Sequence, residues 1–159
     1  MRGDFKMTLT NKETMLLEDL KSQEQLCINK YSRYASDACD TQLRDLFSQL
    51  AQTEREHLTT ITDILAGKTP NMSQGSSSKQ KPQFTQTYTE SCNDKNKEND
   101  CFLCSDALAG EKHVSSVYDT SVFEFSDPQL RNALNHIQKE EQEHGEMLYQ
   151  YMSSNGMYS

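Results

Sequence analysis

The residues best suited to chemistry in this sequence form two Glu-x-x-His pairs, Glu54 with His57 and Glu141 with His144. In an α-helix, residues three apart lie on one face with their Cβ atoms about 5–6 Å apart, so each pair could bind one metal ion. Apolar residues recur at helical spacing around each pair and place it inside the buried stripe rather than opposite it. Because a buried carboxylate is costly unless it is paired, hydrogen-bonded or bound to metal, we interpret both pairs as metal ligands.

The two pairs belong to a longer internal repeat with a constant offset of 87 residues (141 − 54). The same offset relates Tyr31 to Tyr118 and Asp40 to Asp127. A match without gaps across two helices and a turn predicts two helical hairpins of one design, packed about a pseudo-twofold axis. The repeat adds one core carboxylate to each pair, and the full set of candidate metal ligands is Glu24, Glu54, His57, Glu111, Glu141 and His144.

Four helices are predicted to position these residues. Thr10 to Glu13 has the form of a capping box, Asp40 and Asp127 are suited to the N-cap position, and Pro128 suits the first helical turn. We expect helices at about 11–38, 41–66, 102–125 and 128–153, joined in the middle by a polar linker at about 67–100.

A linker of that length is unusual inside a compact domain and favours one long crossover over simple up-and-down connections. The crossover could run back along the whole first hairpin. We therefore expect an all-α four-helix bundle, made of two repeated helical hairpins, that occupies residues 1–159 as a single domain.

The ligand set determines the chemistry that we expect. One Glu from each of two helices and Glu-x-x-His from each of the other two form the inventory of di-iron and di-manganese carboxylate bundles. Four carboxylates neutralise two divalent ions, and one imidazole per ion leaves open positions where dioxygen or hydrogen peroxide could bind. Carboxylate-rich sites suit iron, or alternatively manganese, better than zinc. The alternative is a metal-free core in which Glu and His side chains satisfy one another.

Other polar residues near the pairs are not expected to be ligands. Glu56 and Glu143 lie two residues beyond a ligand, about 200° around the helix, and are expected to face solvent. His136 has no histidine at the corresponding position of the first hairpin and is expected at the surface.

On this ligand set and the four helices that carry it, the chain resembles the ferritin-like superfamily, with a ligand pattern similar to rubrerythrins and bacterioferritins. The resemblance implies two iron ions and an oxidoreductase activity toward dioxygen or hydrogen peroxide, as a ferroxidase or a rubrerythrin-like peroxidase. It also implies that a tyrosine seven residues after the single Glu lies near the metal. Tyr31 and Tyr118 have this spacing and could act by hydrogen-bonding a ligand carboxylate, or they could be ordinary core aromatics.

The chain also resembles the coat F family of spore coat proteins. The resemblance rests on residues 9–13 and 16–20, on Gln42-Leu43-Arg44, and on the tail rich in Tyr, Met and Gly. It implies an alternative function as a structural spore coat protein with a metal-free or vestigial site. The two functions are compatible, since a coat protein could keep a peroxide-consuming centre. A homo-oligomer, either a dimer or a coat assembly, is expected.

The five cysteines do not suggest a secreted disulfide scaffold, because their number is odd. Cys101 and Cys104 form a Cys-x-x-Cys motif with Cys92 upstream. Three cysteines fall short of the four ligands of a structural zinc site, so free thiols are favoured. A redox pair at a helix N-terminus and cross-links between chains in an oxidised coat are the alternatives.

The formal net charge of −8 argues against nucleic acid or an anionic membrane as partner. No apolar run approaches the roughly 18–20 residues that span a bilayer, and the first residues have no apolar signal region. We expect a cytoplasmic protein, or one located in the spore coat of a spore-forming bacterium.

Overall fold

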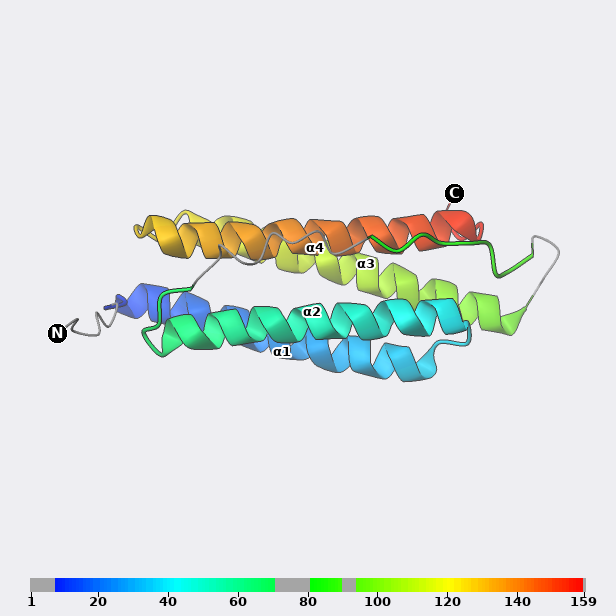
Figure 1. The fold of residues 1–159 in the computed structure, drawn as a ribbon, viewed down its shortest axis with the longest axis horizontal. Coiled ribbons are helices and arrows are strands. Elements are labelled where there is room, and N and C mark those ends of the chain that lie inside the picture. Colours follow the sequence, from blue (N-terminus) through cyan, green and yellow to red (C-terminus); the bar gives the residue numbers. More distant parts are fainter. Residues whose placement is uncertain (1–7, 71–80, 90–93, 159) are drawn as a thin grey trace.

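Four α-helices, each introduced by a capping side chain, make up most of the described chain. The computed structural model describes residues 8–70, 81–89 and 94–158. The helices are α1 (Asn11–Asp37), α2 (Thr41–Leu65), α3 (Lys95–Val122) and α4 (Pro128–Ser154) (Figure 1). Because these residues contain no strand, the predicted all-α four-helix class is confirmed. None of the four helices combines the length and apolar composition that a membrane span requires.

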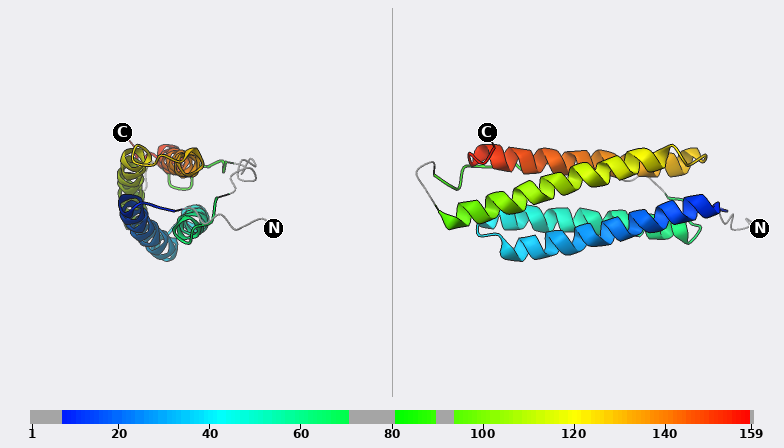
Figure 2. Two further views of the ribbon diagram at one scale, coloured as in Figure 1. Left: turned by 90° about the vertical axis from the view of Figure 1, so that its left-hand side faces the viewer. Right: turned by 180° about the vertical axis from the view of Figure 1, so that it is seen from behind.

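The helices form two antiparallel hairpins that lie side by side, α1 with α2 and α3 with α4 (Figures 1 and 2). The predicted repeat is visible in matching contacts at the two turns. Arg44 Nε donates a hydrogen bond of 2.6 Å to the carbonyl oxygen of Ala38, and Arg131 Nη1 donates one of 3.3 Å to the carbonyl oxygen of Phe125. Both partners are related by the offset of 87 residues, so the two hairpins share one design.

The third helix begins at Lys95, well before the expected start near residue 102. Its first two turns have the polar composition of the linker, but the Asp94 side chain caps them by accepting a 3.0 Å hydrogen bond from the backbone N–H of Asn96. The helix ends at Val122, and Phe125, expected in its last turn, lies beyond it in the turn to α4 and is buried. The linker therefore ends at residue 94 rather than near 100.

A buried carboxylate explains why these first turns of α3 are ordered. Asp100 is fully buried and accepts hydrogen bonds from the backbone N–H groups of Cys39 and Asp40, at 2.8 and 2.9 Å. It also accepts a 2.6 Å hydrogen bond from the hydroxyl of Tyr88. The early turns of α3 thus satisfy the polar groups of the turn between α1 and α2.

The described part of the crossover, residues 81–89, forms hydrogen bonds with the start of α2 and with the end of α4. The Gln42 side chain donates to the carbonyl oxygen of Thr85 and accepts from its backbone N–H, both at 3.0 Å. The backbone N–H of Thr87 donates to Asn155 Oδ1 at 2.8 Å. These contacts hold the crossover against both hairpins.

Two separate apolar clusters form the core, and the predicted ligands lie between them along every helix. On α1, for example, Glu24 lies between Leu20 of one cluster and Tyr31 of the other, and on α4 Glu141 and His144 lie between Ile137 and Met147. The cluster beside the turn between α1 and α2 includes Tyr31, Leu43, Leu50, Leu103, Leu148 and Tyr151. The opposite cluster includes Leu17, Leu20, Ile64, Tyr118, Leu130 and Leu134. The fold therefore isolates one polar layer at mid-bundle.

Candidate metal centre

All six predicted ligands meet in this polar layer. Each is at most 4% exposed, although carboxylates and imidazoles are rarely buried without a partner. The helical spacing of the sequence explains their convergence, because each Glu-x-x-His pair lies on the same face as the apolar residues that dock its helix. In order along the chain, they are Glu24 on α1, Glu54 and His57 on α2, Glu111 on α3, and Glu141 and His144 on α4.

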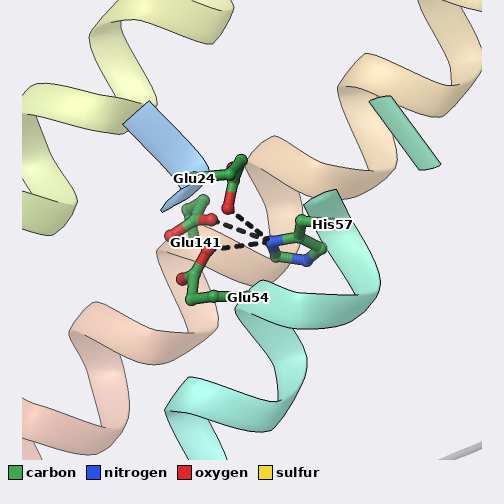
Figure 3. A group of neighbouring side chains, drawn as sticks. All are labelled: Glu24, Glu54, His57 and Glu141. Atoms are coloured by element: carbon green, nitrogen blue, oxygen red, sulfur yellow. Dashed lines mark hydrogen bonds and ion pairs between the residues drawn. The ribbon is translucent and has the colours of Figure 1, made fainter. Parts of the chain in front are cut away.

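The first group surrounds the ring of His57 with three carboxylates from three helices (Figure 3). The Nδ1 atom of His57 lies 3.2 Å from Glu54 Oε2, 3.0 Å from Glu141 Oε1 and 3.7 Å from Glu24 Oε2. One ligand atom from each of the four residues lies within 4.8 Å of the others, so this group could hold one ion.

The second group is the repeat counterpart of the first and is arranged around His144. The Nδ1 atom of His144 lies 3.0 Å from Glu54 Oε1, 3.4 Å from Glu111 Oε1 and 3.6 Å from Glu141 Oε2. These four residues also offer ligand atoms within 4.8 Å of one another.

Glu54 and Glu141 belong to both groups. Each presents one oxygen to His57 and the other to His144, as a carboxylate that bridges two cations would. Glu24 and Glu111 each belong to a single group. The arrangement therefore provides two adjacent sites with two shared ligands.

The hydrogen bonding of the centre tests whether cations fit it. Several buried ligand atoms have no hydrogen-bond partner within the described residues, and such atoms cost about 1–3 kcal/mol each. They are one oxygen from each carboxylate and one ring nitrogen: Glu24 Oε2, Glu54 Oε1, Glu111 Oε2, Glu141 Oε2 and His144 Nδ1. Glu54 Oε1 and His144 Nδ1 lie 3.0 Å apart as an ion pair but do not have the geometry of a hydrogen bond. A network in which Glu and His satisfy one another would not leave these atoms unpaired. The residues present fit two cations better.

Burial and contacts with neighbouring groups shift the pKa values of these carboxyl groups in different directions. Burial, followed by the hydrogen bond with Glu54, raises the pKa of Glu24 to about 8. Burial and the neighbouring Glu111 raise the pKa of Glu141 well above its usual value. Burial also works to raise the pKa of Glu54, but its close contacts with Glu24 and the two histidines lower it overall. Without metal, the centre therefore retains protons on some carboxyl groups while Glu54 is charged.

The two imidazoles are held in their charged form by the carboxylates around them. Burial alone would lower the pKa of His57, but contacts with Glu140 and Glu141 raise it well above its usual value. The pKa of His144 is raised in the same way, mainly by Glu111. Since a metal ligand must be a neutral imidazole, metal binding would have to displace these protons.

Tyr31 and Tyr118 both contact the centre, and each contacts a ligand that belongs to the other hairpin. The hydroxyl of Tyr31 donates a hydrogen bond to Glu111, and that of Tyr118 donates one of 2.5 Å to Glu24 Oε1. Both side chains are buried. Each tyrosine thus holds the unshared carboxylate of the opposite hairpin, not the one seven residues before it.

Glu140 was missed by sequence reasoning. Its Oε1 atom lies 3.2 Å from His57 Nε2 and 2.9 Å from His136 Nε2, on the opposite side of the His57 ring from Glu141. His136 is 27% exposed, so it lies partly at the surface as expected, and it also contacts the centre through Glu140. The signal in the sequence was an acidic residue beside a ligand, with a histidine four residues earlier. Thr53 holds the corresponding position in the first hairpin, so this contact is not repeated.

Cys101 and Cys104 do not form a redox pair at a helix N-terminus, because both lie beyond the first turn of α3. Cys104 is buried, and burial raises the pKa of its thiol. Cys101 is half-buried, and both residues are free thiols, as the sequence favoured. Cys92 lies outside the described residues.

Comparison with known proteins finds one family model that matches part of the chain. The family model described as Coat F domain matches residues 99–159, which hold most of α3 and all of α4. The match supports the coat F resemblance for this part of the chain, which includes Glu111, Glu141 and His144, while the motifs at residues 9–13, 16–20 and 42–44 lie outside it. No curated protein and no solved structure matches the chain, so these comparisons do not support the ferritin-like resemblance.

Proposed function

We propose that the protein binds two iron ions, with manganese as the alternative, in the polar layer of the bundle and reacts with dioxygen or hydrogen peroxide. The observation that supports this function best is the pair of repeat-related ligand groups that share Glu54 and Glu141. Unpaired buried oxygens in both groups favour cations over a metal-free network.

In this proposal, each residue of the centre has a defined role. Glu54 and Glu141 would be shared by both ions, Glu24 and His57 would complete the ligands of one ion, and Glu111 and His144 would complete those of the other. The four carboxylates would balance the charge of two divalent ions, and the apolar clusters on both sides shield the layer from the two ends of the bundle. When bound, the iron ions supply the electrons that reduce the oxidant.

Iron oxidation tests this function directly. Protein loaded anaerobically with Fe(II) and then mixed with hydrogen peroxide, or separately with dioxygen, should consume Fe(II) on the order of tenfold faster than the same iron in buffer. The Glu54→Ala/Glu141→Ala variant should be no faster than buffer, because it lacks both shared ligands. Residual Fe(II) is measured with a colorimetric chelator. Equal rates for wild type and buffer would contradict the proposed reaction.

We assign Tyr31 and Tyr118 the role of holding the unshared carboxylates in place. The Tyr31→Phe/Tyr118→Phe variant keeps every ligand but loses one hydrogen bond to each of Glu111 and Glu24. Its affinity for Mn(II) should fall about 10–100-fold, as is usual when a partner of a metal ligand is removed. Calorimetric titration of the metal-free protein measures the change.

The matched control is Tyr34→Phe. The Tyr34 hydroxyl donates a 2.5 Å hydrogen bond to Asp106, outside the centre, and its loss should leave the affinity unchanged. If the Tyr31→Phe/Tyr118→Phe variant binds Mn(II) like wild type, the two tyrosines are ordinary core aromatics.

The Coat F match favours a second proposed role, as a component of the spore coat that assembles with copies of itself. This role is compatible with a working centre. Fractionation of a spore-forming host, with an antibody against the protein, should locate it in the coat fraction. Finding it only in the cytosol of vegetative cells would rule out this role.

A further inference from the structure

A cavity of about 500 Å³ between α3 and α4 reaches the candidate metal centre from the surface. Glu111 and Glu141 are part of its lining, and one oxygen of each has no hydrogen-bond partner while being buried. Ser115, Gln138 and Gln142 contribute polar groups to the lining, but most of its exposed surface is apolar. The cavity therefore ends at two ligand residues of the centre, whose unpaired carboxylate oxygens lie behind its wall and are closed off from solvent.

At two of the corresponding positions the first hairpin carries larger, apolar side chains. Leu58 corresponds to Gly145 of the cavity lining, and Ile28, which is buried, corresponds to Ser115. Between α1 and α2 there is a smaller cavity, of about 360 Å³, but none of its lining residues is a candidate ligand. The two hairpins thus provide similar ligand groups, but of these two cavities only that of the second hairpin is lined by candidate ligands.

Helix packing does not require the glycine at position 145. A Cβ atom placed there would meet Leu108 Cδ1 at 3.6 Å, which is ordinary van der Waals contact. A glycine inside a helix is nevertheless about 1 kcal/mol less favourable than alanine. A small residue at this point keeps the cavity open, at a cost to the stability of α4.

We propose that this cavity is the route by which hydrated divalent cations reach the two sites, an inference that rests on the proposed function. Ser115, Gln138 and Gln142 offer hydroxyl and amide oxygens, which can replace the water of a hard cation in steps. Glu111 and Glu141 are the candidate ligands at the inner end of this cavity. Lys112 and Asp119 also line the cavity and bring one charge of each sign.

Substitution of the repeat counterparts into the cavity tests the route. The Gly145→Leu/Ser115→Ile variant should take up Co(II) about tenfold more slowly than wild type and bind the same number of ions at equilibrium. Uptake is followed by stopped-flow mixing of metal-free protein with Co(II), whose visible absorption changes when protein ligands replace water. The matched control, Ser36→Leu/Ser48→Ile, adds the same side chains to the cavity between α1 and α2 and should leave the uptake rate unchanged.

A second variant, at an exposed position, tests the route even if the first variant does not fold. Gln142 is exposed, and Gln142→Arg introduces its counterpart, Arg55, together with a positive charge beside the cavity. Co(II) uptake should slow, and added salt should reduce the effect because it screens the charge. Wild-type uptake rates in both variants would overturn the route while leaving the metal centre intact. Absence of Co(II) binding at equilibrium by wild type would instead contradict the proposed function itself.

Discussion

Mn(II) added to the metal-free protein at about a hundred times its dissociation constant should raise the melting temperature by about 10–20 °C. One ion at that concentration stabilises the folded chain by about 2.7 kcal/mol, and two sites together give about twice as much. For a chain of this size, each kcal/mol shifts the melting temperature by about 2–4 °C. The Glu54→Ala/Glu141→Ala variant should lose nearly all of the gain, because both sites share these two carboxylates.

The control for this prediction is Glu56→Ala/Glu143→Ala, which removes the same formal charge from the same two helices. Glu56 is exposed and Glu143 is half-buried, and neither belongs to a ligand group. Its gain in melting temperature should match that of wild type. An equal gain in the Glu54→Ala/Glu141→Ala variant would show that Mn(II) stabilises the protein from somewhere else.

The stability of the metal-free protein should fall as the pH rises from about 4.5 to above 8. The pKa of Glu24 is raised from 4.5 to about 8, so the folded chain keeps a proton that the unfolded chain loses in this range. Stability from this group is fully present below pH 4.5 and is lost as the pH rises through 8. His57 and His144, whose pKa values are raised well above 6.5, act in the same direction from about pH 6.5 upward.

Urea unfolding in the presence of a chelator, at pH values from 5 to 8.5, measures this loss, which should be on the order of several kcal/mol. In the Glu24→Gln variant, the free energy of unfolding should depend less on pH below pH 8. Divalent ions displace the same protons, so stabilisation by Mn(II) should increase over the same range. A metal-free protein that becomes more stable between pH 5 and 8 would contradict the assigned protonation of the centre.

The positions of the six candidate ligands could be predicted because they depend on local helical geometry and on a repeat. Glu54 and His57 share a face by their spacing alone, and the offset of 87 residues carries that face to Glu141 and His144. The burial of these ligands could be predicted because they share a helix face with apolar residues, and this does not depend on how the helices pack against one another.

Other features depend on how the two hairpins dock, which spacing alone does not contain. The partner of Tyr31 is Glu111, and the partner of His57 Nε2 is Glu140, both from the opposite hairpin. The early start of α3 was missed for a similar reason. The stretch from Lys95 to Asp100 is polar like a linker, and only its packing against the turn between α1 and α2 explains a buried Asp100.

The most direct test of the metal centre is elemental analysis of protein purified without added metal. Wild type and the Glu56→Ala/Glu143→Ala control should each contain close to two iron or manganese ions per chain, one for each ligand group. The Glu54→Ala/Glu141→Ala variant should contain almost none. A wild-type protein that holds no transition metal, and takes up none when exposed to Fe(II), would contradict the account and leave a polar layer in a structural bundle.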